Sequence, residues 1–410
     1  MQLPNSMELS FALRNLFRQR GRTAMTLASI VFGVIGLILS GGFVEDVFVQ
    51  LREATIHSRL GHLQIYRAGF YANGAKDPYG YMIDDAEVVQ REIDALPGVV
   101  DSMKRVNFFG LVNNGKTDLP IIGEGVEPTK EARLGSYVYV IEGRQLRDDD
   151  AYGILLGEGV AKSLKLDVGS FVTVLANTPD GALNSLEFEI VGVFRTFSKD
   201  YDARAVRVAL PAAQELLSVA GVHAVVVSLA DTLATDATAE SAKASLSGDG
   251  YELKTWFELD DFYAKTVDLY RSQLGVLQII ILVVVLLSVA NSVSMTAYER
   301  VGEFGTLKAL GKRSGDIARL IILENALLGL IGASLGLLLG VLLALAISAI
   351  GIPMPPPPNA NMGYTALIRL VPSILLVSFL IGLLATVLSA LLAARGASRV
   401  PVVEALRQNI

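Results

Sequence analysis

The sequence predicts a membrane protein with four transmembrane helices and one large extracytoplasmic α/β domain of two lobes. Four apolar stretches, at 23–43, 274–293, 323–350 and 371–394, each approach or exceed the roughly 20 residues that a helix needs to cross about 30 Å of hydrocarbon. A long, mainly polar region separates the first stretch from the second. The hydrophobic fraction of 52% and the mean hydropathy of +0.47 are also high for a soluble protein.

These patterns divide the chain into nine segments. We expect an amphipathic helix along the inner membrane surface (1–22, with a simple basic flank as the alternative), span one (23–45), the outer domain (46–272), span two (273–295), a cytoplasmic loop (296–319), span three (320–350), a Pro-rich loop (351–370), span four (371–394) and a tail (395–410). Helix-permissive sequence at 47–54 and 262–273 predicts that spans one and two extend beyond the membrane as stalks. The Pro-rich loop is either a stiff linker or a contact for the outer domain.

The orientation follows from the basic residues near the span ends. Lys and Arg cluster before span one, between spans two and three, and after span four, whereas the loop between spans three and four holds only Arg369. By the positive-inside rule, both termini and the 296–319 loop are cytoplasmic, and residues 46–272 lie outside. That outer region carries 22 Lys and Arg against 34 Asp and Glu, a net charge of −12, which argues against nucleic acid or anionic lipid as its partner.

The outer domain reads as two lobes. Two strand–helix–strand patterns lie far apart in the sequence and are predicted to pair into one split sheet. Between them, residues 110–210 are rich in short alternating runs, which indicates a second, mainly β lobe inserted into the first. The two patterns are strand 63–67, helix 84–96 and strand 99–109, then strand 224–229, helix 235–246 and strand 251–257.

Nothing in the sequence supports catalysis by this chain. Residues 110–117 (GLVNNGKT) match the phosphate-binding loop pattern, but that pattern needs a helix directly afterwards, and Asp118-Leu119-Pro120 indicates a strand and therefore a hairpin turn. The absence of Cys excludes disulfides and Cys-ligated metals, and three histidines are too few for a convincing triad or metal site. We therefore expect no catalytic, metal or cofactor site.

Small residues recur at helical spacing in two spans. Gly332, Gly336 and Gly340 form a stripe that lets another helix approach closely, either within the chain or in a dimer. Span one carries a similar stripe around Gly33. Glu324, at the cytoplasmic start of span three, is expected in a hydrated interfacial position.

The 296–319 loop contains ERVGEFGTLKALG at residues 299–311. This resembles the E-R-x-x-E-[IF]-G-x-x-[KR]-A-x-G stretch of FtsX-type permeases, the membrane subunits of type VII ABC transporters, which include MacB-like and LolC/LolE-like proteins. Residues 13–23, ILLGE at 154–158 with LDVG at 166–169, and PVVEALR at 401–407 are similar to the N-terminal helix, outer-domain core and tail of that family. The resemblance runs from about residue 8 to residue 408.

The resemblance implies that residues 299–311 couple the spans to a cytosolic ABC ATPase, present in two copies. ATP and Mg²⁺ would bind to that separate subunit, because no fused ATPase is seen in this chain. A second permease chain, identical or a sister subunit, would complete a complex in the bacterial inner membrane, with residues 46–272 in the periplasm. The residues implied in coupling are Glu299, Arg300, Glu303, Phe304, Gly305, Lys308 and Gly311.

Within the family, the chain most resembles the stand-alone LolC/LolE-like branch. This implies mechanical transmission of ATP-driven motion to the outer domain, which would handle lipoprotein or another apolar cargo at the outer leaflet, in contact with membrane lipids and with a periplasmic chaperone as a further partner. The alternatives are an FtsX-like regulator of a periplasmic cell-wall hydrolase and, more remotely, a membrane-anchored enzyme.

Overall fold

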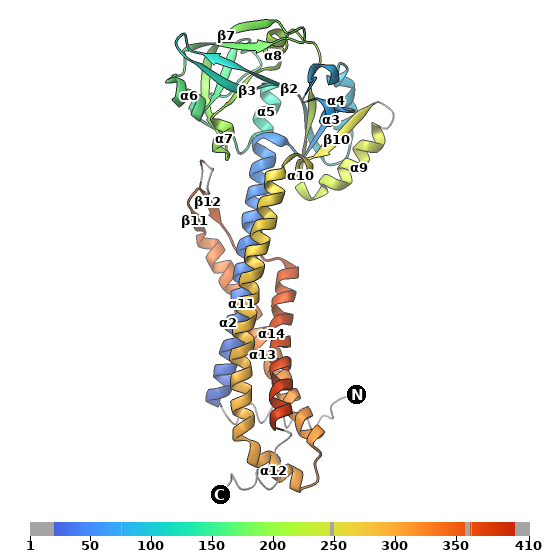
Figure 1. The fold of residues 1–410 in the computed structure, drawn as a ribbon, viewed down its shortest axis with the longest axis vertical. Helices are drawn as coiled ribbons and strands as arrows, with labels where there is room; N and C mark the ends of the chain where they lie inside the picture. Colours follow the sequence, from blue (N-terminus) through green and yellow to red (C-terminus); the bar gives the residue numbers. More distant parts are fainter. Residues whose placement is uncertain (1–19, 75, 247–249, 357–360, 362, 398–410) are drawn as a thin grey trace. The chain divides into compact units, whose positions relative to one another are not determined.

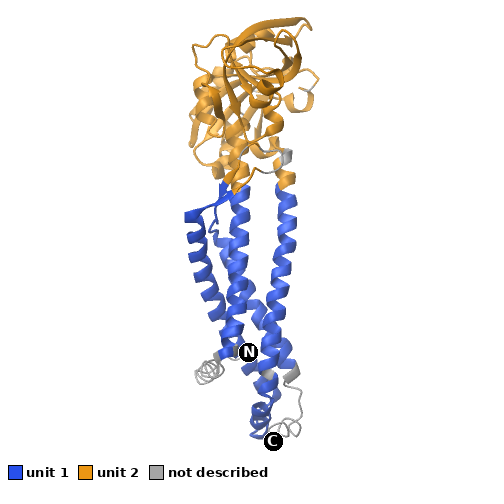
Figure 2. Ribbon diagram, turned by 90° about the vertical axis from the view of Figure 1, so that its left-hand side faces the viewer, with its two compact units in different colours: residues 1–48, 267–353, 365–410 blue, residues 49–266, 354–364 orange. Residues whose placement is uncertain are grey.

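The computed structural model describes residues 20–74, 76–246, 250–356, 361 and 363–397 (Figure 1). The amphipathic helix predicted at 1–22 and the tail predicted at 395–410 lie almost entirely outside the described residues. The chain divides into two compact units (Figure 2). Unit 1 combines residues up to 48 with 267–353 and the chain from 365 onward, and unit 2 comprises 49–266 with 354–364.

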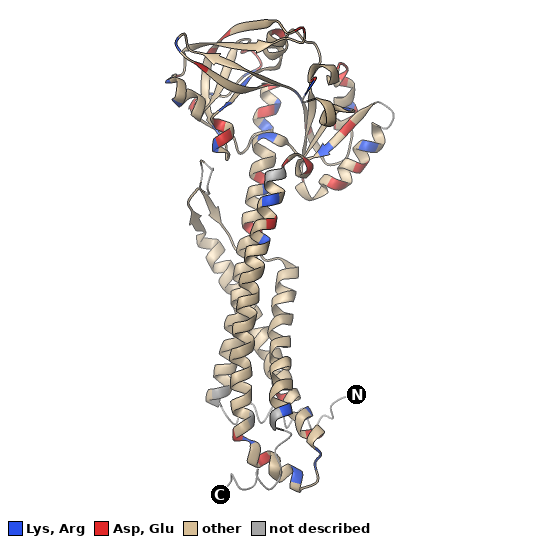
Figure 3. Cartoon of the chain, in the orientation of Figure 1, with Lys and Arg blue, Asp and Glu red and all other residues tan. Residues whose placement is uncertain are grey.

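Four helices are long and apolar enough to cross a membrane, as predicted. They are α2 (Arg20–Thr55), α11 (Asp261–Glu299), α13 (Ser314–Ile350) and α14 (Pro372–Ala397). In unit 1 their charged residues gather toward the helix ends, with long uncharged stretches between (Figure 3). Helices α2 and α11 each supply residues to both units.

The apolar interior of unit 1 is made by the facing sides of these helices. Buried side chains of α2 such as Ile30 and Val34 pack with Val289 of α11, Ala333 of α13 and Ala385 of α14. The short helix α12 (Val301–Ala309) adds to the same cluster.

The loop before α14 is fastened to α2 by a carboxylate. The fully buried Asp46 accepts hydrogen bonds from the Leu367 backbone N–H (2.9 Å) and from the Arg369 Nε (2.8 Å). Arg369, the one basic residue of that loop, therefore neutralises a buried acid of α2.

Unit 2 contains one ten-stranded sheet. Its path is β10-β1-β9-β2-β3-β8-β5-β7-β4, and β6 pairs with both β2 and β7. The strands are β1 (Leu63–Arg67), β2 (Val99–Asn113), β3 (Asp118–Val126), β4 (Tyr139–Gly143), β5 (Gly153–Gly157), β6 (Phe171–Asn177), β7 (Leu183–Arg195), β8 (Ala205–Ala209), β9 (Ala224–Leu229) and β10 (Tyr251–Thr255). The helices are η1 (Ile56–Leu60), α3 (Phe70–Asn73), η2 (Tyr79–Tyr81), α4 (Ala86–Asp94), α5 (Pro128–Leu134), α6 (Glu158–Leu164), α7 (Lys199–Asp202), α8 (Leu210–Leu217), η3 (Thr232–Ala234), α9 (Thr235–Ser245) and α10 (Trp256–Leu259).

The first lobe joins strands from opposite ends of the domain. Strand β1 lies between β9 and β10 and is antiparallel to both, with Leu63 opposite Val227 on one side and Thr255 on the other. Helices α4 and α9 belong to the two predicted strand–helix–strand patterns. The split sheet expected from the sequence is therefore present.

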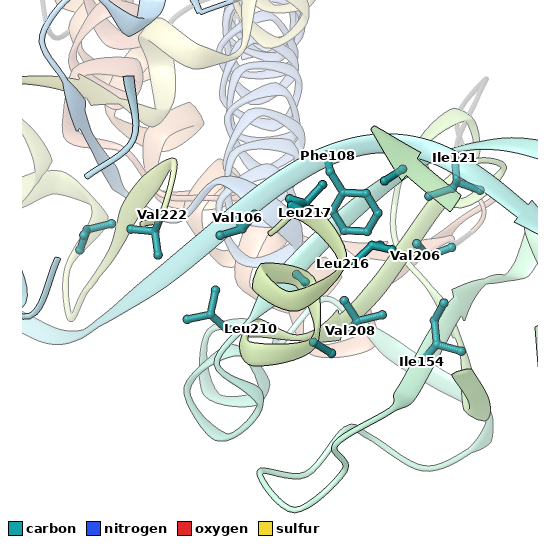
Figure 4. Packing of buried hydrophobic residues seen from close by; sticks show 14 of the residues in the cluster. Val106, Phe108, Ile121, Ile154, Val206, Val208, Leu210, Leu216, Leu217 and Val222 are labelled. Carbon is teal, nitrogen blue, oxygen red and sulfur yellow. The ribbon is translucent and has the colours of Figure 1, made fainter. Parts of the chain in front are cut away.

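The second lobe is a ring of strands that shares β2 with the first. Residues 99–105 of β2 pair with β9, and residues 105–113 pair with β3. Around the ring, each strand pairs with the next in the order β2, β3, β8, β5, β7, β6 and back to β2. Figure 4 shows buried side chains of the ring, including Phe108, Ile121 and Val206, packed with Leu216 and Leu217 of α8.

The stretch that matches a phosphate-binding loop is a β-hairpin. Asn113 of β2 pairs with Asp118 of β3, and Gly115 between them has a left-handed φ of +84°. The Asn114 side-chain oxygen accepts hydrogen bonds from the N–H groups of Lys116 and Thr117, which closes the turn. The hairpin prediction is confirmed.

The Pro-rich loop contains two short paired strands, β11 (Ile352–Met354) and β12 (Tyr364–Ala366). Residues 354–364 group with unit 2. There, the backbone N–H of Asn361 donates to the Phe197 carbonyl (3.2 Å), and its side-chain amide donates to Asp202. Of the two alternatives for this loop, the structure shows a contact with the outer domain rather than an inert linker.

Candidate functional site

The loop predicted to couple to an ATPase folds as a compact helical element. α12 ends at a glycine cap in which Gly311 adopts a left-handed φ of +93°. The Gly311 N–H donates to the Lys308 carbonyl and the Lys312 N–H to the Leu307 carbonyl, both at 3.0 Å. These two bonds form the Schellman pattern, which satisfies the last carbonyls of a helix and fixes its end.

Three of the predicted coupling residues hold α12 against the rest of unit 1. Arg300 donates to both carboxylate oxygens of Glu324 in α13 and to Glu303 (3.1 Å), and its guanidinium lies over the Phe304 ring. Phe304 is 2% exposed and Gly305 is also buried. Arg300, Phe304 and Gly305 therefore make internal contacts of the chain.

The expected hydrated position of Glu324 was wrong. Its side chain is buried, with a relative exposure of 7% for the residue. The turn at α12 brings the Arg300 guanidinium onto this carboxylate, and a bidentate partner offsets the cost of burying the charge. The sequence places these two residues 24 positions apart, so their pairing depends on a tertiary contact.

The other predicted coupling residues face outward or lie half-buried. Glu299 and Gly311 are exposed, and Glu303 and Lys308 are intermediate. Leu310, which follows the last residue of α12, is 79% exposed. The outward side of α12 thus combines charged residues with one prominent apolar side chain.

The glycine stripe of α13 lies against α2 of the same chain. A Cβ atom at Gly332, Gly336 or Gly340 would approach side chains of α2 to within 3.0, 2.8 and 2.8 Å, respectively. The residues met are Ile30, Val34 and Ile38, which are also spaced one helical turn apart. On span one, Gly33 faces Val285 of α11, while a Cβ at Gly36 would meet no described atom within 4 Å.

Within unit 2, α2 ends at the sheet through a π-helical turn. η1 follows α2 directly, and Gly61 (φ +66°) turns the chain into β1. The last carbonyls are held by two arginines from the sheet: Arg207 of β8 donates to the Ser58 carbonyl (2.9 Å), and Arg105 of β2 donates to the Arg59 carbonyl. A guanidinium suits this position because the C-terminal end of a helix carries partial negative charge.

Two carboxylates complete what we call the arginine cluster, namely Arg105, Glu124, Glu131 and Arg207. Arg105 pairs with Glu131 (2.7 Å), and Arg207 pairs with Glu124 (3.0 Å) and Glu131 (3.3 Å). All four residues are between 2% and 6% exposed. Burial opposes the charge on Glu124, but the positive charges of Arg207 and Arg105 lower its pKa below the usual value.

The start of α11 in unit 2 is fastened differently. Thr255 and Glu258 form a reciprocal capping box at α10, which immediately precedes α11. The Trp256 N–H donates to the His62 carbonyl (3.0 Å), and the Trp256 and Tyr263 rings pack edge to face, with centroids 4.9 Å apart. This junction is mainly aromatic, and Phe257 beside it is 52% exposed.

Two histidines are buried as neutral acceptors near these elements. His62 Nδ1 accepts from the Leu229 N–H (3.1 Å), so its Nε2 donates to Thr232 Oγ1 (3.1 Å). His223 Nδ1 accepts from the Asn107 N–H (3.2 Å). Burial is the main cause that lowers the pKa of each to about 4. Among the described residues, no group of three or more His, Asp or Glu could hold a metal ion.

The family described as the MacB-like periplasmic core domain matches residues 23–245, more than half of the chain, and the FtsX-like permease C-terminal family matches residues 275–402. The chain belongs to the MacB- and FtsX-like ABC transporter permeases.

Named relatives of this permease agree with that assignment. It is 24% identical to an uncharacterized ABC transporter permease of Methanocaldococcus jannaschii over 97% of both chains. It is 22% identical to the lipoprotein-releasing system transmembrane protein LolC of Neisseria meningitidis, over 78% of this chain and 76% of that protein. It is 28% identical to the pyoverdine export ATP-binding/permease protein PvdT of Pseudomonas aeruginosa, over 83% of this chain and 50% of that protein.

Sequence reasoning about this permease missed the arginine cluster. A usable signal was present, because Arg207 interrupts the otherwise apolar strand AVRVA at 205–209, and Glu124 lies between two glycines in a strand that is buried at its end. A charged residue at the centre of a buried strand must have a buried partner. The sequence alone does not say that the partners include the end of α2.

Proposed function

We propose that this permease converts ATP hydrolysis by a separate cytosolic ATPase into motion of its outer domain, without passage of a substrate between the spans. The chain itself is then non-catalytic, with ATP and Mg²⁺ bound to two copies of the ATPase. A second permease chain completes the complex. Relatives named as permeases and transmembrane proteins of ABC and lipoprotein-releasing systems support this reading.

The observation that carries the proposal is the continuity of two helices. α2 has 36 residues and α11 has 39, without a break in either helix. At 1.5 Å per residue these helices are about 54 and 58 Å long, against roughly 30 Å of hydrocarbon. Each supplies residues to both units, so a tilt of the span is also a displacement of residues that belong to unit 2.

The cytoplasmic input would be α12. The Arg300–Glu324 pair and the buried Phe304 tie this helix to α13, so a push on its outward side moves the spans rather than α12 alone. Glu299, Lys308 and the exposed Leu310 form the surface that would meet the ATPase. Gly305 and Phe304 would support that surface from inside.

The distribution of Lys and Arg supports a topology with both termini and residues 296–319 in the cytoplasm, and with residues 46–272 in the periplasm of the inner membrane. Lipids would then surround the spans.

For the cargo we propose a lipid-attached protein at the outer leaflet. The lipoprotein-releasing relatives favour it. Unit 2 also exposes two large apolar side chains on either side of one end of β6, with Phe109 of β2 80% exposed and Leu183 of β7 66% exposed. An apolar surface of this kind suits an acylated partner, and a periplasmic chaperone would receive the cargo.

The test is affinity purification of the full-length permease in mild detergent, with identification of everything bound and measurement of ATP hydrolysis. We expect an ABC ATPase to co-purify. Leu310→Asp should abolish both ATPase retention and ATP hydrolysis, because a charge replaces the apolar contact at the interface. Leu233→Asp is the matched control, because Leu233 is 78% exposed but lies in η3 of unit 2.

Retention of the ATPase by Leu310→Asp would show that α12 is not the coupling element. A co-purified lipid-attached protein would support the proposed cargo. A bound cell-wall hydrolase would instead make the complex an FtsX-like regulator.

A further inference from the structure

We infer that the arginine cluster is the joint through which the outer domain follows α2, with Arg105 and Arg207 as positioning residues that fix the end of this helix to both lobes. This inference rests on the proposed mechanical function. It concerns the connection between stalk and domain rather than the connection between spans and ATPase.

The joint lies at the seam between the lobes. Arg105 is the residue at which β2 passes from one lobe to the other, because it is paired with Ala224 of β9 on one side and with Val126 of β3 on the other. Arg207 belongs to the ring through β8, which pairs with β3 and β5. One helix end is thus bound by residues of both lobes.

The bonds are made to the backbone, which gives the joint its stiffness. Ser58 and Arg59 present their carbonyl oxygens at the end of η1, so the two acceptors move with the helix backbone and have no side-chain rotation of their own. The four residues of the cluster are also buried, so a polar group whose bond opens there loses a partner at high cost. Separation of α2 from the sheet would leave the two buried guanidinium groups with fewer hydrogen-bond partners.

Side-chain bonds around the same helix end reinforce the joint. Glu53 of α2 accepts a hydrogen bond from Thr232 Oγ1 (3.2 Å), and His57 Nδ1 lies 3.2 Å from the Leu134 carbonyl of α5. Arg59 lies over the Tyr201 ring, with its guanidinium carbon 5.5 Å from the ring centroid.

The unit contains a matched ion pair that does not touch α2. Arg195 of β7 and Glu158 of α6 form a bidentate pair with distances of 2.7 and 2.6 Å, within the ring. Its removal perturbs the ring by the loss of a bidentate pair, although a more exposed one, and leaves both carbonyl contacts of the helix end in place. It therefore separates the loss of an ion pair from the loss of the joint.

The experiment uses spin labels on the full-length permease in its co-purified complex. The chain has no native Cys, so Leu51→Cys in α2 and Glu187→Cys in β7, both within unit 2, give one defined distance. The test variant is the double substitution Arg207→Met with Glu124→Leu, which removes one buried charge of each sign and keeps the Arg105–Glu131 pair. Such apolar replacements of buried pairs are usually compatible with folding. The control is Arg195→Met with Glu158→Leu, and fluorescence of Trp256, the only tryptophan, checks folding.

We expect a narrow distance distribution in the parent and the control, and a broadened one in the test variant with unchanged Trp256 fluorescence. A test variant that folds and keeps the narrow distribution would overturn the joint. A test variant that fails to fold while the control folds would also contradict it, because the cluster would then be a requirement of the fold rather than a joint. The reverse pattern, with broadening in the control alone, would place the joint at the ring.

A second label pair, Glu187→Cys with Ile350→Cys in α13, reports motion of the outer domain when ATP is added. We expect an ATP-dependent shift in the parent and its loss in the test variant, with ATP hydrolysis retained. A persistent shift in the test variant would overturn the inference. The absence of any shift in the parent would refute the proposed function instead. The distance distribution between positions 51 and 187, measured without nucleotide, would still test whether the arginine cluster fixes the end of α2.

Discussion

The two helices that lead into unit 2 meet its sheet in chemically different ways. At the end of α2, buried arginines bind the last backbone carbonyls and are balanced by buried carboxylates. At the start of α11, a capping box and an aromatic group around Trp256 make the connection, and part of that group is exposed.

The two junctions differ in how large a change of angle between helix and sheet they allow. Burial of apolar surface is non-directional, and the preferred geometry of an aromatic pair is worth only about 0.5–1.5 kcal/mol, so a small shift of these rings costs little. Ion pairs and hydrogen bonds to fixed carbonyls lose most of their energy when the geometry changes, and more so when they are buried. The α2 junction is therefore built to hold one orientation, and the α11 junction is able to adjust.

The largest expected effect comes from removal of one charge at the α2 junction. Arg207→Met leaves Glu124 without its principal partner in a buried position, and we expect the free energy of unfolding of unit 2 to fall by about 3–5 kcal/mol. Denaturant titration followed by Trp256 fluorescence measures this change. Arg195→Met, whose side chain is 32% exposed in the parent, should cost only about 1 kcal/mol. Equal losses in the two variants would remove the distinction between the cluster and an ordinary ion pair.

The second-largest expected effect is a loss of stability at acid pH, caused by protonation of the two buried histidines. The loss per histidine is smaller than the loss expected for Arg207→Met. Each has a pKa of about 4 in the folded protein and 6.5 as the reference for the unfolded chain. Between these values the unfolded state binds a proton and the folded state does not, so stability is complete above pH 6.5 and falls as the pH drops toward 4. Each histidine contributes at most about 3 kcal/mol to this loss.

Replacing His62 and His223 one at a time measures how much each histidine contributes to the acid sensitivity. The His62 ring bonds Thr232, which donates to Glu53 of α2, and the His62 carbonyl accepts from Trp256 at the α11 junction. The His223 backbone N–H donates to the Arg105 carbonyl, and the His223 ring lies near Phe70 and Tyr79. His62→Gln and His223→Gln should each flatten the dependence of the unfolding free energy on pH between 6.5 and 4. An unchanged pH profile in both variants would mean that other groups cause the acid sensitivity.

The smallest expected effect is at the α11 junction itself. Thr255→Ala removes the capping box and should lower the free energy of unfolding of unit 2 by about 1 kcal/mol, measured by the same titration. Ser241→Ala, on α9, also deletes a hydroxyl that bonds to backbone but caps no helix, and its effect should lie within about 0.5 kcal/mol. If Thr255→Ala costs as much as Arg207→Met, the two junctions contribute equally to the stability of unit 2, and the contrast between them fails.

Much of this fold could be predicted because it depends on local pattern. Span lengths, the strands at 63–67 and 224–229 and the hairpin at Gly115 follow from hydrophobic period and turn chemistry, which act over a few residues. The family could also be inferred, because residues 299–311 carry a dense motif.

The parts that could not be predicted depend on contacts between distant segments. The sequence does not show that Arg300 contacts Glu324. All of the predicted coupling residues were therefore interpreted as one docking surface, although Phe304 and Gly305 are buried. The closure of six strands into a ring and the meeting of Arg105 with the end of α2 likewise require the register of β2 against β3 and β9. Alternating patterns identify strands but leave their partners open.

The glycine stripe of α13 limits how α2 can travel. Ile30, Val34 and Ile38 of α2 each pack against one glycine of α13, so the side chains of one helix fill the gaps along the other. A partial slide would drive the branched side chains into the ridges between the glycines, and the next position of equal fit is about 5.4 Å away, one full turn. This packing opposes movement of α2 along its axis by a fraction of a turn unless α13 moves with it.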